Sequence, residues 1–104
     1  MDINTFNARA QAIRERYHAL EIKQNGQPWS VEQDALAFLT DAALVGRLVM
    51  DKEESWPTSQ TETSLAYKMG ETIWWLASIA EAESIDLATA MEDFLRSREE
   101  HLGL

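Results

Sequence analysis

The chain has 104 residues, of which 45% are hydrophobic and 26% are charged, and it contains no cysteine. This length fits a single domain, residues 1–104, with enough apolar side chains for a core. The absence of cysteine excludes a disulfide framework, a thiolate metal site and a cysteine nucleophile. The formal net charge of −9 argues against binding to a nucleic-acid polymer, because phosphate backbones need clustered Lys and Arg.

The N-terminus and the apolar stretches bear on where the protein works. The first residues, MDINTFNARA, lack the basic and apolar regions of a signal peptide. Charged residues interrupt the longest apolar stretches, which fall short of a membrane span. The sequence therefore predicts a cytoplasmic protein that has no membrane partner.

A first amphipathic helix is predicted from the apolar side chains that recur every three or four residues. These side chains belong to Ile3, Phe6, Ala10, Ile13, Tyr17 and Leu20. Charged side chains, including Arg14, fall off this face. Asn25, Gly26 and Pro28 are turn and helix-breaking residues, so we expect the helix to end before Lys23.

Ser30 is predicted to cap a second helix, with Gln33 three residues later completing a capping box. From Ala35 to Met50 this helix is apolar on nearly every side. A helix of this kind is usually buried at the centre of a bundle.

A polar loop, DKEESWPTSQTET, follows, and Ser59 with Glu62 forms a plausible capping box for a third helix. The main apolar stripe of that helix consists of Leu65, Met69, Thr72, Leu76 and Ile79. Lys68, Glu71 and Trp75 form a flanking stripe, and Trp74 points away from the main one.

A break at AESID separates a fourth helix, which Ser84 or Asp86 is expected to cap. This helix is expected to end near Gly103. Its apolar side chains, expected to be buried, are those of Leu87, Met91, Phe94 and Leu95.

No stretch alternates between apolar and polar residues, so no strand is predicted, and the fold class is all-α with four helices. The second and third helices carry more apolar surface than four short helices can cover. We therefore expect a homodimer or a higher homo-oligomer.

Three charged residues lie in the apolar helices: Asp41 in the second, and Lys68 with Glu71 in the third. A carboxylate on an apolar helix is costly to bury unless it is paired or binds a metal ion. The lysine beside Glu71 suggests that the charge is balanced within the protein. Whether this is a metal site or the remnant of one decides the function.

A helical site that cleaves polyphosphates needs carboxylates from at least two helices to hold Mg²⁺. Residues three apart share a helix face, so its signature is two acid-x-x-acid pairs. In this chain the two segments read Asp41-Ala-Ala-Leu44 and Lys68-Met-Gly-Glu71.

At these residues the chain resembles the MazG-type nucleotide pyrophosphohydrolases, an all-α superfamily. The resemblance covers roughly residues 10–98 and includes the lead-in Pro28-Trp29-Ser30, the stretch LVMDKE and the turn SIDLATAME. It implies a MazG-like four-helix bundle completed by dimerisation. It also implies Mg²⁺-dependent hydrolysis of (d)NTPs to monophosphates and pyrophosphate, with Asp41 and Glu71 as metal ligands.

Leu44 and Lys68 depart from the family pattern, because they replace two expected acidic ligands. An ammonium near Asp41 and Glu71 could occupy the role of the metal, which would leave a weak or inactive hydrolase. Alternatively, Mg²⁺ could still be held by two carboxylates and the substrate phosphates, with Lys68 contacting a phosphate. The alternative outside the family is an unrelated bundle in which Lys68 and Glu71 form a solvated pair.

Three further residues are candidates for contacting a nucleoside triphosphate. Trp75 lies one or two turns from Lys68 and Glu71 and could wall a pocket, while Trp29 could stack on a base and Lys23 could meet a phosphate. Each also has a simpler interpretation, as a packing or solvated side chain. A non-catalytic bundle that binds a nucleotide or a protein therefore stays open as an alternative.

Overall fold

The computed structural model of the chain describes residues 1–57 and 63–104. Four helices follow one another: α1 (Ile3–Asn25), α2 (Val31–Lys52), α3 (Leu65–Ala82) and α4 (Leu87–Leu102). The described residues contain no strand, which confirms the all-α prediction. None of the four helices is both long and apolar enough to cross a lipid bilayer.

Side-chain caps fix where the helices begin. The hydroxyl or carboxylate of Asp2, Ser30, Ser64 and Asp86 accepts a hydrogen bond from the backbone N–H three residues later, which satisfies an otherwise unpaired helix donor. The predicted capping box of Ser30 and Gln33 is confirmed, and Asp86 caps α4. Ser59 and Glu62 lie outside the described residues, and α3 is capped by Ser64 instead.

Glycine fixes where α1 and α4 end. Gly26 and Gly103 adopt φ of 82° and 72°, a left-handed conformation that glycine reaches without steric cost. The N–H of Gly26 donates to the carbonyl of Ile22. Because this cap lies beyond Lys23, α1 continues to Asn25, and the prediction that it ends before Lys23 was wrong.

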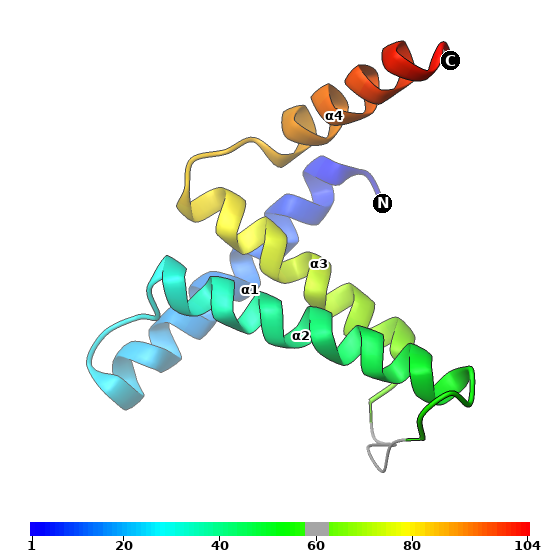
Figure 1. Cartoon of the computed structure of the whole chain (residues 1–104). Helices are drawn as coiled ribbons and strands as arrows, with labels where there is room; N and C mark the ends of the chain where they lie inside the picture. The colour runs from blue at the N-terminus through cyan, green and yellow to red at the C-terminus, as the bar shows by residue number, and fades with distance from the viewer. Residues whose placement is uncertain (58–62) are drawn as a thin grey trace.

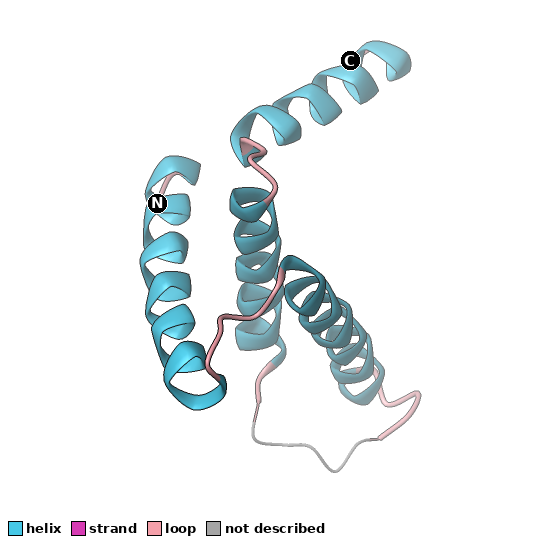
Figure 2. Ribbon diagram, turned by 90° about the vertical axis from the view of Figure 1, so that its left-hand side faces the viewer, coloured by secondary structure: helices cyan, strands magenta, loops and turns pink. Residues whose placement is uncertain are grey.

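Helix α3 is the centre of the packing, with α2 along one side and α1 along another. Figures 1 and 2 show these two helices flanking α3. The residues of α3 that become buried are Trp75, Ala77, Ser78 and Ala80. The predicted stripe was wrong in part: Met69 and Leu76 are exposed, whereas Leu65, Thr72 and Ile79 are half-buried.

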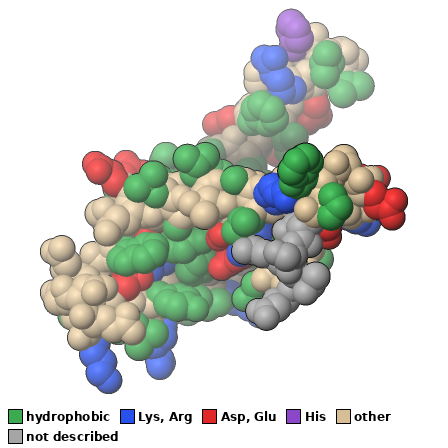
Figure 3. Space-filling model, turned by 60° about the horizontal axis from the view of Figure 1, so that its bottom comes forward, with side chains coloured by type: hydrophobic (Ala, Val, Ile, Leu, Met, Phe, Trp, Pro, Cys, Tyr) green, Lys and Arg blue, Asp and Glu red, His purple; other side chains and the backbone are tan. Residues whose placement is uncertain are grey.

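Two further burial predictions were wrong. Helix α2 is not buried at the centre: Leu36 and Leu39 are exposed, and only Asp34 is buried in this helix. Helix α4 contains no buried residue, and it extends away from the other helices (Figures 1 and 2). The physical reason is the same for both, since only α3 is covered on two sides. Figure 3 shows the hydrophobic side chains that consequently lie on the surface.

Candidate functional site

Asp41, Lys68 and Glu71 come together between α2 and α3. The ammonium of Lys68 lies 3.3 Å from Oδ1 of Asp41 and 2.5 Å from Oε1 of Glu71. The side chains of Lys68 and Asp41 are each only 13% exposed, and that of Glu71 is partly exposed. One cation therefore bridges two carboxylates in a largely dehydrated position, where ion pairing is stronger than at a surface.

Trp75 completes the hydrogen bonding of Asp41. Its indole N–H donates to Oδ2 of Asp41 at 3.0 Å, while Oδ1 accepts from Lys68. Both oxygens of this carboxylate are therefore engaged by protein donors. Four residues from two helices form one connected cluster, which we call the Lys68 cluster (Asp41, Lys68, Glu71 and Trp75).

The charge state of Lys68 follows from its partners. The hydrogen bond to Glu71 raises the pKa of Lys68, burial lowers it, and the hydrogen bond and charge of Asp41 raise it further. The net effect is a pKa above the ordinary value of 10.5. The ammonium of Lys68 is thus retained at neutral pH, where it contacts both carboxyl groups.

A second ion cluster, which the sequence did not predict, lies beside the first. Arg14 is 3% exposed, and its guanidinium contacts Oδ1 of Asp34 at 2.7 Å and Oε2 of Glu21 at 2.8 Å. Burial lowers the pKa of Arg14, but its hydrogen bonds and charge interactions with Glu21 and Asp34 together raise the pKa above its usual range. We call Arg14, Glu21 and Asp34 the Arg14 cluster.

A signal for the Arg14 cluster does exist in the sequence. Arg14 and Glu21 are seven residues apart, and they lie at helical spacing with Ala10 and Tyr17 of the predicted apolar face. Asp34 also lies seven residues before Asp41, which places both carboxylates on one side of α2. The prediction that Arg14 lies off the buried face of α1 was wrong, because Asp34 of another helix pairs with its charge.

An aromatic cavity lies between α1, the following loop and α3. The rings of Trp29 and Trp75 stack nearly parallel, 9° apart, with centroids 6.1 Å from one another. They line a cavity of about 380 Å³ together with Tyr17, Trp74 and the carboxylates of Glu21 and Glu71. The backbone N–H of Trp29 donates to Oε1 of Glu21 at 2.7 Å, which fixes the loop against α1.

The structure brings most of the predicted site residues together but not all of them. Asp41, Lys68, Glu71 and Trp75 form one cluster, and Trp29 joins it through Trp75. Leu44, at the position of an expected ligand, is half-buried in α2. Lys23 is exposed in the last turn of α1 and does not line the aromatic cavity.

The arrangement can do two things chemically. Each ion cluster pairs one cation with two carboxylates between the helices, and the aromatic cavity offers apolar surface to a planar ring. Within residues 1–57 and 63–104, no three His, Cys, Asp or Glu side chains gather as a metal-binding group. Comparison of the chain with protein-family models, with curated proteins and with solved structures finds no match.

Proposed function

We propose that the protein is a MazG-like helical protein that does not hydrolyse nucleoside triphosphates, and that it assembles as a homodimer. The observation that carries the proposal is the position of the Lys68 ammonium, in contact with both Asp41 and Glu71. In the family these two positions are expected to bind Mg²⁺. Here a cation belonging to the chain already lies between them.

The donor set of the Lys68 cluster does not fit a resident Mg²⁺. Mg²⁺ requires oxygen ligands in near-octahedral geometry. The cluster offers two carboxylates, and both oxygens of Asp41 already accept hydrogen bonds, from Lys68 and Trp75. Binding a metal ion would require the ammonium to leave its two partners, which would place two positive charges where there is now one.

The homodimer is supported by the surface that the single chain leaves open. The exposed side chains include large apolar residues of all four helices, such as Ile13, Leu39, Ile73 and Phe94. A large number of exposed apolar side chains is typical of a chain that associates with another protein. A second copy of the chain carries the same exposed apolar side chains, so two copies can cover one another's surface.

The proposal is tested by pyrophosphate release from a panel of (d)NTPs with Mg²⁺ or Mn²⁺. We expect no turnover by the wild type. Turnover that disappears in Asp41→Ala would contradict the proposal, because it would show that the cluster is catalytic. Circular dichroism of each variant checks that the helices are retained.

The reverse substitution gives a readout other than activity. Leu44→Glu combined with Lys68→Glu restores the two acids of the family pattern and creates a cluster of like charges that only a cation can relieve. We expect Mg²⁺ to raise the unfolding temperature of this double variant but not that of the wild type. The absence of any Mg²⁺ effect on the double variant would contradict the MazG-like interpretation of the site.

The aromatic cavity favours a second function, the binding of a planar heteroaromatic ring without a metal ion. Trp29, Trp74, Trp75 and Tyr17 line the cavity, and its volume of about 380 Å³ is within the range of small-molecule sites. Arg14 lines the cavity and its guanidinium lies 5.4 Å from the Trp75 ring centroid, but it is already bound to Glu21 and Asp34. A nucleoside should therefore bind more tightly than its triphosphate.

Titration of nucleosides and nucleotides, followed by isothermal calorimetry, tests this second function. Trp29→Ala is expected to weaken nucleoside binding, with a stacking loss of about 1–3 kcal/mol. Trp56→Ala is the matched control, because Trp56 is exposed and does not line the cavity. Equal binding by wild type and Trp29→Ala, or tighter binding of triphosphates than of nucleosides, would contradict it.

A further inference from the structure

Helix α4 presents an apolar face that nothing in the chain covers. Met91, Phe94, Leu95 and Leu102 are all exposed, and no residue of the helix is buried. The four side chains lie at helical spacing and so share one side of the helix. In proteins most helical stability comes from the packing of an amphipathic face, which indicates that α4 packs against another surface.

The chain exposes more surface area than a compact monomer of its mass. The exposed area is 7891 Å², whereas a folded monomer of 11.8 kDa is expected to expose about 5,900 Å². The radius of gyration of 16.4 Å also exceeds the value of about 13 Å expected for a compact domain of this length. The excess of about 2,000 Å² in each chain matches the area that obligate dimers bury.

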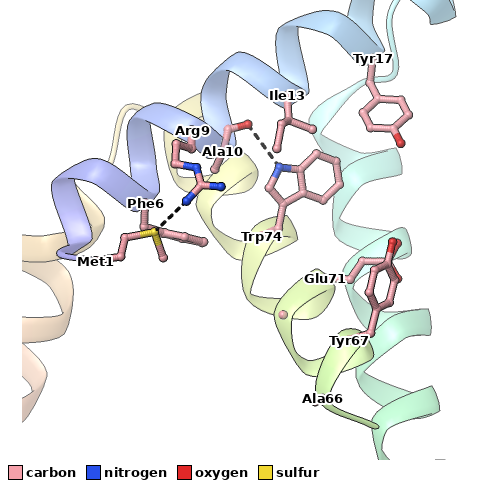
Figure 4. Close-up of a pocket in the computed structure, with 11 residues that line it drawn as sticks. Met1, Phe6, Arg9, Ala10, Ile13, Tyr17, Ala66, Tyr67, Glu71 and Trp74 are labelled. Carbon is pink, nitrogen blue, oxygen red and sulfur yellow. Dashed lines mark hydrogen bonds between the residues drawn. The ribbon is translucent and has the colours of Figure 1, made fainter. Parts of the chain in front are cut away.

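A groove between α1 and α3 is the complementary surface. It has a volume of about 440 Å³ and is walled by apolar side chains, among them Phe6, Ile13, Tyr67 and Trp74. Figure 4 shows these side chains on both sides of the groove. Gly70 lies in it as well, and a Cβ atom built there would meet no other atom within 4 Å. A helix can therefore approach α3 closely at this point.

Charge also matches α4 to α1. Helix α1 carries four basic and two acidic side chains, and it is the one helix of the four with a net positive charge. Helix α4 carries two basic and four acidic side chains, which leaves a net charge of −2. These opposite net charges favour association of α4 with α1, whereas pairing of α4 with another α4 is disfavoured by repulsion.

We infer that α4 of a second copy occupies the groove between α1 and α3, so that the two copies exchange their α4 helices about a two-fold axis. This inference rests on the homodimer of the proposed function and names the surfaces that form it. The groove shares Tyr17, Glu71 and Trp74 with the aromatic cavity. The exchanged helix consequently borders the cavity, and assembly of the dimer completes one side of the site.

Two pairs of variants test the surfaces by light-scattering mass. Phe94→Glu on α4 should convert the dimer to a monomer, whereas Leu36→Glu on α2 should not; the two residues are 64% and 63% exposed. Gly70→Phe should block the groove without weakening α3, because phenylalanine has a higher helix propensity than glycine. Gly46→Phe is its control, since Gly46 is helical and equally open.

The outcomes separate this inference from the proposal on which it rests. A monomeric wild type would overturn both the homodimer and the exchange of α4. A wild-type dimer that survives Phe94→Glu and Gly70→Phe, or that is lost in Leu36→Glu or Gly46→Phe, would overturn the exchange alone. Pyrophosphate release is measured separately and does not depend on either result.

Crosslinking distinguishes exchange between copies from folding back within one chain. The chain has no cysteine, so Ile13→Cys with Leu95→Cys introduces one thiol near the middle of the groove and one near the middle of the α4 face. A short bismaleimide should yield a covalent dimer on a denaturing gel. A crosslinked monomer would overturn the inference, because it would place α4 in the groove of its own chain.

Discussion

Trp75 is the residue at which the two ion clusters meet. Its indole N–H binds Asp41 of the Lys68 cluster, and the guanidinium of Arg14 lies 5.4 Å from its ring centroid, a favourable cation–π distance. Each cluster contains one cation and two carboxylates. Among the described residues, no buried side-chain nitrogen or oxygen lacks a hydrogen-bond partner. The buried polar groups between the helices are thus hydrogen-bonded, and Trp75 connects the two ion clusters.

Arg14→Ala should be the most destabilising single substitution of a charged residue in the described chain. It removes the cation that Glu21 and Asp34 share, and leaves the buried carboxylate of Asp34 and the half-buried one of Glu21 without it. Breaking a buried pair in this way costs about 3–5 kcal/mol. The measurement is urea unfolding followed by circular dichroism, with the free energy of unfolding compared between wild type and variant.

Two companion variants make the Arg14 measurement decisive. Arg16→Ala removes an exposed arginine from the same helix and should change stability by no more than about 0.5 kcal/mol. Arg14→Lys keeps the charge but lacks the planar guanidinium that contacts both carboxylates. Its free energy of unfolding should therefore lie between those of the wild type and Arg14→Ala. If Arg14→Ala cost no more than Arg16→Ala, the Arg14 cluster would have no role in stability.

Glu21 gives the protein a specific sensitivity to acid. Burial raises the pKa of Glu21, but hydrogen bonds from Arg14 and from the Trp29 backbone outweigh burial and hold the pKa below its ordinary value of 4.5. Since the folded-state pKa is the lower one, Glu21 stabilises the fold above about pH 4.5. This contribution is lost as the pH falls through the folded-state pKa.

The acid prediction is checked with Glu21→Gln. As the pH is lowered below about 4.5, the free energy of unfolding of the wild type should decrease more steeply than that of Glu21→Gln. Urea unfolding at a series of pH values provides the two slopes. Parallel slopes would show that Glu21 titrates equally in the folded and unfolded protein.

At the scale of the helix, the local signals that begin a helix are reliable in this chain. Ser30 and Gln33 form their capping box, and Asp86 caps α4. These signals were readable from the sequence because a cap involves residues only three positions apart. The choice of buried face was not readable in the same way, as the exposed Met69 and the buried Ser78 of α3 show.

Ser30→Ala should destabilise the protein by about 1 kcal/mol through loss of the α2 cap. Both the Ser30 hydroxyl and its backbone N–H take part in the capping box. The start of α2 also positions Asp34 in contact with Arg14. Ser97→Ala is the control, because Ser97 is exposed inside α4. Equal unfolding free energies for the two variants would show that the cap contributes no stability.

At the scale of the whole molecule, the described residues form only a small core. None of the large side chains in residues 1–57 and 63–104 is fully buried, and α4 buries nothing. Stability should therefore come partly from association. In an obligate dimer, stability cannot be separated from protein concentration.

The unfolding temperature should rise with protein concentration, by about 3 °C for each tenfold increase if two copies unfold together. Differential scanning calorimetry over two decades of concentration measures this shift. Phe94→Glu, which is designed to abolish the dimer, should show no shift. A concentration-independent transition in the wild type would indicate that the chain folds and unfolds alone.

The sequence alone determined the all-α class, the number of helices and the start of α2, and it gave Asp86 as one of two caps for α4, because periodicity and caps act over three or four residues. It also pointed to Asp41, Lys68 and Glu71 as a charged group on apolar helices. Only the tertiary structure decided that Lys68 reaches Asp41, 27 residues away, and that Arg14 reaches Asp34, 20 residues away. Contacts between helices depend on which faces meet, and that is set by the packing of all the helices together.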